Sequence, residues 1–163
     1  MAPILSFTAD EIWRTLSGQF GASLGAESVH LTTFPEAKQE WQDPGLVKRW
    51  DRLLEVRTAV QAALEEQRRN KVIGSSLEAV VEIQANSDTY GFLKPYESDL
   101  SALFIVSGAK LKEVHDLPEQ PDFVVTVSKA TAKKCERCWN YRAAVGSNAA
   151  HPTLCDRCVE ALQ

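Results

Sequence analysis

Lys133-Lys-Cys-Glu-Arg-Cys-Trp139 and Leu154-Cys-Asp-Arg-Cys-Val159 are the two stretches that decide the fold near the end of this 163-residue sequence. They hold all four cysteines, and sixteen residues separate the two pairs. Two intervening residues let one tight turn aim both sulfurs at a single point, and a second such turn completes a tetrahedron. The pattern predicts one structural Zn²⁺ per chain, bound by Cys135, Cys138, Cys155 and Cys158.

Other uses of paired cysteines fit the sequence less well. Structural disulfides need an oxidising compartment, and the sequence shows no signal peptide. A redox Cys-x-x-Cys normally occurs once, beside a strand–helix unit. His151 lies four residues before Cys155 and could bind a metal, but four thiolates already fill the shell. We therefore expect His151 beside the shell or at the surface.

The composition indicates a folded chain without a membrane partner. Hydrophobic residues make up 44% and charged residues 25%, which excludes a disordered class. No apolar run approaches the ~18 residues of a membrane span. No targeting segment precedes Ala2, so we expect a reducing cytoplasm, which suits cysteines that bind metal.

The charge is unevenly distributed along the chain. The net charge is -4, which by itself argues against a nucleic-acid partner. From Lys129 onward, however, six basic residues outnumber three acidic ones, so this tail carries +3 and the rest carries -7. Four thiolates with one Zn²⁺ reduce the tail to +1. The tail therefore permits a nucleic-acid contact without requiring one.

Two helices are expected before residue 72. In the first, Thr8 and Glu11 form a capping box, and Gly18 and Gly21 mark the end. The second begins at Asp43-Pro44 and continues to residue 70. Its single apolar stripe consists of Leu46, Trp50, Leu53, Val60 and Leu64. The arginines that flank this stripe fit either a solvated face or an RNA-binding face: Arg49, Arg52 and Arg57.

The pattern changes to a small α/β layer with about four strands. Alternation predicts a strand at 77–83, followed by a helix at 86–100 capped by Ser87 or Asp88. Three further strands are expected at 103–106, 110–115 and 122–127, with a loop at 118–121. No phosphate loop, nucleophile elbow or useful carboxylate pair is present, so we expect neither catalytic nor cofactor-binding residues here.

An aromatic side chain follows the first cysteine pair directly. Trp139 can pack under the metal turn or present its face to an unstacked base. Cations surround the same module, and single-stranded loops are bound by this mixture of cations and aromatic faces. The candidate RNA-binding residues are Trp139, Lys133, Lys134, Arg137, Arg142 and Arg157.

Several segments, spread over almost the whole chain, carry a resemblance to a known family. They are Pro3-Ile-Leu-Ser-Phe-Thr-Ala-Asp-Glu-Ile-Trp13, Glu27-Ser-Val-His-Leu31, Val56-Arg57, Ile73-Gly-Ser-Ser-Leu-Glu-Ala79 and the two cysteine stretches. Each motif alone is moderately specific, but their order and spacing are highly specific. Together they resemble the bacterial-type isoleucyl-tRNA synthetases, which are class I aminoacyl-tRNA synthetases.

The resemblance implies an α+β chain in several parts. Residues 1–72 would be the end of an all-α anticodon-binding bundle with a long helix, 73–128 a small α/β junction domain, and 129–163 a four-cysteine zinc ribbon or knuckle. The parent enzyme joins isoleucine to its tRNA using ATP. The implied partners are the anticodon stem-loop of isoleucine tRNA and the rest of the synthetase chain, in a monomeric enzyme.

The catalytic signatures of that family are absent from this sequence. It has no His-x-Gly-His, and its one methionine, Met1, excludes Lys-Met-Ser-Lys-Ser. The resemblance therefore covers the C-terminal part of the enzyme, and ATP belongs to the parent. Two alternatives remain open. One is the zinc finger of formamidopyrimidine-DNA glycosylases, although their N-terminal proline-glutamate is missing, and the other is a zinc ribbon that only stabilises the chain end or binds protein.

Overall fold

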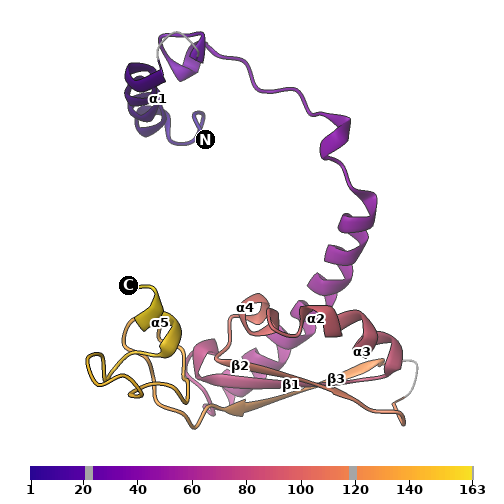
Figure 1. Cartoon of the computed structure of the whole chain (residues 1–163). Helices are drawn as coiled ribbons and strands as arrows, with labels where there is room; N and C mark the ends of the chain where they lie inside the picture. The colour runs from indigo at the N-terminus through magenta and orange to yellow at the C-terminus, as the bar shows by residue number, and fades with distance from the viewer. Residues whose placement is uncertain (21–23, 118–120, 163) are drawn as a thin grey trace. The chain divides into compact units, whose positions relative to one another are not determined.

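A computed structural model describes residues 1–20, 24–117 and 121–162 (Figure 1). They form two compact units, Met1–Pro44 and Gly45–Gln163. The expected α+β class is confirmed, with helices, a small sheet and a four-cysteine cluster near the C-terminus. Of the helices in the described ranges, none is both long enough and apolar enough to cross a membrane. Gly21, which was expected at the end of the first helix, and residues 118–120 of the expected loop lie outside the described residues.

The first unit is built on helix α1 (Ser6–Phe20), with short 3₁₀ turns η2 (Val29–Leu31) and η3 (Gln39–Trp41) after it. The expected cap at Thr8 is wrong, because the helix begins two residues earlier. Backbone hydrogen bonds from Ile4 and Leu5 to the Met1 carbonyl form a turn that leads directly into the helix.

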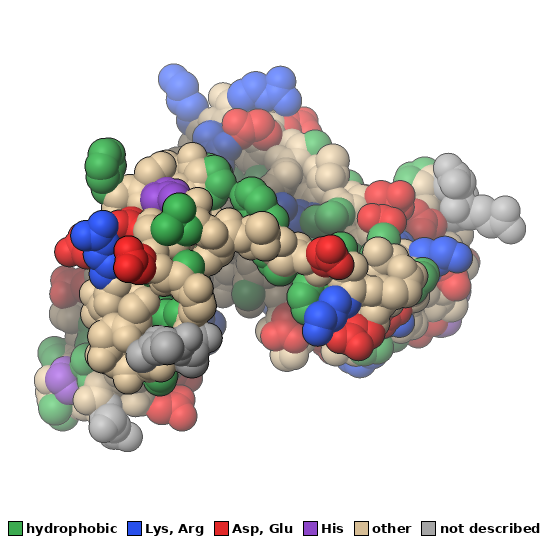
Figure 2. Space-filling view, turned by 90° about the horizontal axis from the view of Figure 1, so that it is seen from above, with side chains coloured by type: hydrophobic (Ala, Val, Ile, Leu, Met, Phe, Trp, Pro, Cys, Tyr) green, Lys and Arg blue, Asp and Glu red, His purple; other side chains and the backbone are tan. Residues whose placement is uncertain are grey.

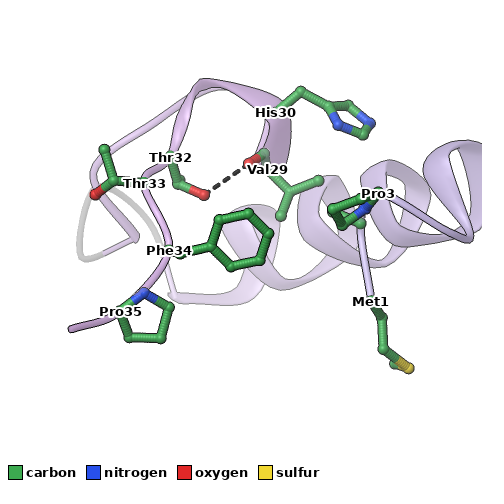
Figure 3. A pocket seen from close by; sticks show the side chains of 9 residues that line it. Met1, Pro3, Val29, His30, Thr32, Thr33, Phe34 and Pro35 are labelled. Atoms are coloured by element: carbon green, nitrogen blue, oxygen red, sulfur yellow. Dashed lines mark hydrogen bonds between the residues drawn. The ribbon is translucent and has the colours of Figure 1, made fainter. Parts of the chain in front are cut away.

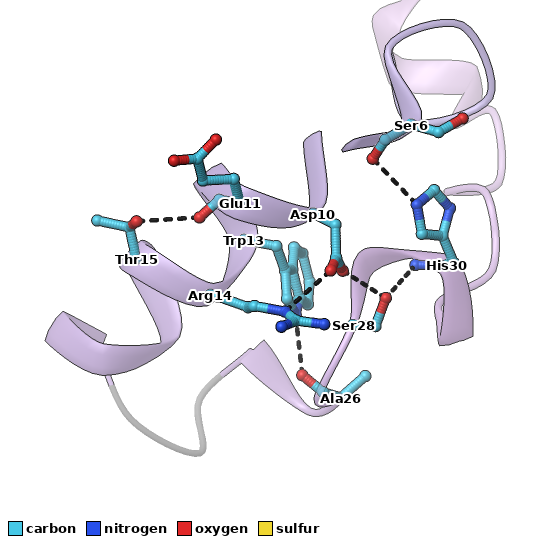
Figure 4. A network of polar contacts seen from close by, with 9 residues as sticks. All are labelled: Ser6, Asp10, Glu11, Trp13, Arg14, Thr15, Ala26, Ser28 and His30. Carbon is cyan, nitrogen blue, oxygen red and sulfur yellow. Dashed lines mark hydrogen bonds and ion pairs between the residues drawn. The ribbon is translucent and has the colours of Figure 1, made fainter. Parts of the chain in front are cut away.

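Polar contacts tie α1 to the segment that follows it (Figure 4). The Trp13 indole donates to the Ala26 carbonyl at 2.8 Å, and the Ser28 hydroxyl donates to Asp10 at 2.5 Å. The Ser28 hydroxyl holds the pKa of Asp10 below its ordinary value, burial opposes this effect, and the Arg14 charge lowers the pKa further. These contacts, more than apolar burial, hold the unit together, since no described α1 residue is buried.

An open cavity of about 290 Å³ lies in the same unit (Figure 3). The N-terminal turn lines one side of it, and the segment from Val29 to Pro35 lines the other. Phe34 in that lining remains 78% exposed. The cavity is therefore a shallow apolar hollow, with no cluster of chemically reactive side chains.

Helix α2 (Pro44–Arg69) confirms the long second helix and its start at Pro44. Its buried residues are Leu53, Val56, Val60 and Leu64. The expected stripe is therefore buried only beyond its first turns, because Leu46 and Trp50 are close to half exposed. Val56, which the stripe omitted, belongs to the buried face.

The second unit contains a three-stranded sheet in the order β2-β1-β3. The central strand β1 (Ala79–Ala85) runs parallel to β2 (Gly108–Glu113) and antiparallel to β3 (Phe123–Lys129). Every second residue of β1 is buried, as the alternation predicted. Helices α2, α3 (Ser87–Leu93) and α4 (Leu100–Phe104) lie over one face of the sheet (Figure 1). The turn η4 (Ser76–Glu78) precedes β1.

Two expectations for this layer are wrong. The helix expected at 86–100 is broken: α3 ends at Leu93, the 3₁₀ turn η5 (Lys94–Tyr96) contains Pro95, and the cap of α3 is Asn86, whose side chain accepts from Thr89 N. The strand expected at 103–106 is the end of α4 and its turn, so the described residues form three strands. Ile105 adopts the left-handed conformation that ends α4. A short apolar run does not distinguish a buried strand from a buried helix turn.

Candidate metal centre

The four cysteines are brought together by two tight turns. In the first turn, Trp139 N donates to the Cys135 carbonyl at 2.9 Å, which closes the loop around Glu136 and Arg137. In the second turn, Cys158 N donates to the Cys155 carbonyl at 3.0 Å, where helix α5 (Asp156–Glu160) begins. Each Cys-x-x-Cys spacing therefore forms one compact turn, as expected.

The sulfur positions fit one tetrahedral zinc ion. All four Sγ atoms lie within 4.8 Å of one another, and those of Cys138 and Cys155 are 3.7 Å apart. A Zn–S bond of about 2.3 Å places the corners of a tetrahedron about 3.8 Å apart. Cys135, Cys155 and Cys158 are buried, and Cys138 is partly exposed. The donor set is the all-thiolate set of closed structural zinc sites.

The electrostatics of the thiols also favour a bound cation. Burial raises the pKa of Cys155 to about 12. Burial opposes ionisation of Cys138 too, but hydrogen bonds from the Asn140 backbone and side-chain amides, with smaller ones from Cys135 and Cys158, lower the pKa to about 6. Cys135 also has a lowered pKa, because backbone N–H groups such as Cys155 N outweigh its burial. The protein thus supplies hydrogen-bond donors that favour the thiolate form of two of the sulfurs, and a thiolate is the form that binds a metal.

His151 is not part of the cluster. Among the described residues, the group that could hold a metal contains the four cysteines and no histidine. His151 is partly buried, and its backbone N–H is held by Asn148. This agrees with the expectation that it lies outside the metal shell.

Two family models match the chain. One, described as the anticodon-binding domain of tRNA ligase, matches residues 1–83, and the other, described as a zinc finger found in FPG and IleRS, matches residues 132–161. The chain belongs to the anticodon-binding family of tRNA ligases. The zinc-finger match agrees with the four-cysteine cluster and one structural zinc.

The curated relatives with similar sequences are isoleucine–tRNA ligases. The chain is 44% identical to an isoleucine–tRNA ligase of Geobacter sulfurreducens over 100% of the chain, and 46% identical to one of Syntrophotalea carbinolica over 99%. An isoleucine–tRNA ligase of Caldanaerobacter subterraneus is 38% identical over 100% of the chain. The chain spans 18% of the length of each of these relatives. It is homologous to the C-terminal region of bacterial isoleucyl-tRNA synthetases.

Trp139 does not join the buried cluster of the zinc module. That cluster consists of Cys135, Val145, Cys155 and Cys158, with Cys138 and Leu154 packed against it. The side chain of Trp139 is 60% exposed, and the Lys134 ammonium lies 5.3 Å from its ring centroid. Its φ of 64° is in the left-handed region that disfavours a residue with a side chain. The first turn thus displays an aromatic face on a strained backbone.

The basic candidates occupy different environments. Lys133, Lys134 and Arg137 are exposed beside the first turn. Arg157 is exposed as well, and its interaction with the neighbouring Cys138 sulfur raises the pKa of Arg157. Arg142 is partly buried, and its Nε has no hydrogen-bond partner among the described residues. Figure 2 shows blue and red side chains close to one another at several places on the surface.

Two residues of the module's surroundings escaped the sequence interpretation. Asn140 donates its side-chain amide to the Cys138 carbonyl at 3.2 Å. Ser107 accepts a hydrogen bond from Tyr141 N at 2.7 Å. Asn140 could have been suspected from its place next to the turn, whereas a contact between residues 34 positions apart left no sequence signal.

Proposed function

We propose that this chain is the tRNA-binding C-terminal region of an isoleucine–tRNA ligase, and that it holds the anticodon stem-loop of isoleucine tRNA. Chemistry takes place in the remainder of a monomeric cytoplasmic enzyme, which uses ATP to join isoleucine to its tRNA. Within the chain, residues 1–72, 73–128 and 129–163 act as anticodon-binding, junction and zinc-binding parts. The activity of the similar isoleucine–tRNA ligases and the match to the anticodon-binding family support this proposal.

The single observation that carries the RNA contact is the display of Trp139. A tryptophan that is 60% exposed at φ 64° costs about 1–2 kcal/mol relative to an unstrained backbone. Strain of this kind persists where a side chain has a task, and an indole face beside a lysine ammonium suits an unstacked base. Lys134 lies over the ring, and Lys133 and Arg137 are further exposed cations near it in sequence.

The DNA-glycosylase alternative shares only the zinc module. The zinc-finger description includes both families, so residues 132–161 do not discriminate between them. Residues 1–83 match an anticodon-binding domain, which favours RNA over DNA. The anticodon-binding match over residues 1–83 also favours the proposal over a zinc ribbon that only stabilises the chain end or binds protein.

The experiment is a titration of the zinc-loaded chain with the anticodon stem-loop of isoleucine tRNA. We expect saturable binding that weakens when the anticodon bases are exchanged while the stem is kept. Equal affinity for both stem-loops, or none for either, would remove the proposal. The chain alone should give only background in isoleucine-dependent pyrophosphate exchange, because it lacks both nucleotide-binding signatures.

A further inference from the structure

The zinc module and the α/β layer have separate cores. The layer's core is formed by apolar side chains of α2, β1, α3 and α4, and the module's by its cysteines and Val145, with no residue in common. A groove of about 510 Å³ lies between them, lined on the layer side by Ser101 and Ser107 and on the module side by Tyr141 and Arg142. Because no shared apolar core joins the two parts, directed polar contacts have to fix their relative orientation.

The Ser107 hydroxyl supplies such a contact, because it both donates and accepts a hydrogen bond. The Oγ atom donates to the Leu77 carbonyl at 2.5 Å and accepts from Tyr141 N at 2.7 Å. The backbone of Ser107 is itself held by the sheet, since its N–H donates to the Ala79 carbonyl at 3.1 Å. Of the hydrogen bonds described for residues 131–162, the one from Tyr141 N is the one that reaches back to the layer.

Tyr141 in turn belongs to a rigid part of the module. It pairs with Lys134 in an antiparallel bridge, and Arg142 N donates to the Lys133 carbonyl at 3.0 Å. Cys135 N donates to the Asn140 carbonyl at 2.9 Å in the same hairpin. A constraint on Tyr141 is therefore a constraint on the whole first cysteine turn, which includes the exposed indole.

We infer that Ser107 is a positioning residue that fixes the first cysteine turn, and with it the face of Trp139, relative to the α/β layer. The role for RNA binding rests on the proposed function, whereas the structural link does not. Ser107 touches no RNA in this scheme. It acts by limiting the orientations of the module in the free protein, which lowers the entropic cost of RNA binding.

The first test measures the link directly in the zinc-loaded chain. The Tyr141 amide should exchange slowly with solvent in the parent protein. In Ser107→Ala its exchange should accelerate by about 2- to 12-fold, the factor to which the net contribution of one hydrogen bond corresponds. Ser107→Thr, which keeps the hydroxyl, should restore slow exchange. Ser101→Ala, which removes another hydroxyl from the same groove, is the matched control and should change nothing.

Residual dipolar couplings give the orientation itself. Amides of β1 and of the zinc module should share one alignment in the parent and in Ser107→Thr, and should require two alignments in Ser107→Ala. A loss of stability alone does not produce this signature. Unchanged Tyr141 exchange and a single shared alignment in Ser107→Ala would overturn the inference. If Ser107→Ala does not fold, the parent protein and Ser107→Thr supply the test. Rapid exchange of the Tyr141 amide in the parent would overturn the link, whereas slow exchange in both proteins would support it.

Stem-loop binding then tests the functional half. Ser107→Ala should weaken binding by at most the same 2- to 12-fold and should add little to Trp139→Ala, because Ser107 acts through the placement of that ring. Fully additive losses would overturn the positioning role. If Trp139→Ala leaves binding unchanged, the proposed RNA contact fails, while exchange and alignment still decide the link.

Discussion

The α/β layer and the zinc module exclude water in different ways. In the layer, side chains such as Val60, Ile83 and Leu93 are completely buried, and each contributes about 1.5–3 kcal/mol through apolar burial. In the module, the completely buried residues are Cys135 and Cys155, and Val145 is the one buried non-cysteine of its described cluster. A segment this short cannot build a sufficient apolar core, so a metal takes its place. Two neighbouring parts of one unit should therefore fail under different perturbations.

Metal removal should produce the largest difference between them. Structural zinc in small modules supplies about 10–16 kcal/mol of apparent binding free energy, which becomes folding free energy. Chelation, or Cys155→Ser, should unfold residues 131–162 while the layer remains folded. Elemental analysis and an amide NMR spectrum report zinc content and the state of each part.

The matched control for the metal is His151→Ala. Since His151 lies outside the cysteine cluster, this variant should retain one zinc per chain. Much less than one zinc in a thiol-protected parent sample contradicts the assignment. Loss of zinc in His151→Ala would instead make this side chain a ligand.

A cavity in the layer should give the reverse pattern. Ile83→Ala removes a completely buried side chain from the central strand and should cost about 2–5 kcal/mol of the layer's unfolding free energy. Denaturant unfolding followed at layer amides measures this loss, and zinc should stay bound. Val124→Ala, at a position 41% exposed on β3, should cost far less. If zinc dissociates at the layer's unfolding midpoint, the two cores form one cooperative unit.

The sequence predicted both cores where the spacing of residues is itself the geometry. Alternation revealed Val81 and Ile83, and two Cys-x-x-Cys turns revealed the metal cluster. The prediction from sequence failed at residues 103–106, because a short apolar run has no periodicity. Ile105 ends a helix there in the left-handed region. The contact of Ser107 with Tyr141 joins distant positions, so only the folded chain reveals it.

Substitutions on the surface of the module should affect its stability less than its affinity for RNA. Trp139→Ala should weaken stem-loop binding by about 1–3 kcal/mol, the worth of one stacked base, with zinc content unchanged. Trp139→Gly should lose the same affinity, yet retain zinc more firmly under chelator competition, because glycine accepts φ 64° without strain. Titrations of both variants and of Trp139→Phe, which keeps an aromatic face, measure this. Zinc loss in Trp139→Ala would make the indole part of the module's core.

The smallest expected effect separates two arginines that occupy the same position in their cysteine pairs. Arg137 is exposed, so Arg137→Ala should reduce the salt dependence of stem-loop binding by about 0.7 in log–log slope if it meets one phosphate. Arg157 is exposed too, but its guanidinium lies beside the Cys138 sulfur, so it is less available to a phosphate. Arg157→Ala should leave the slope unchanged and weaken zinc retention under chelator competition. Binding isotherms at several salt concentrations distinguish them. Equal slope changes in both variants would mean that Arg157 leaves the sulfur when RNA binds, which makes both cysteine turns part of the RNA-binding surface.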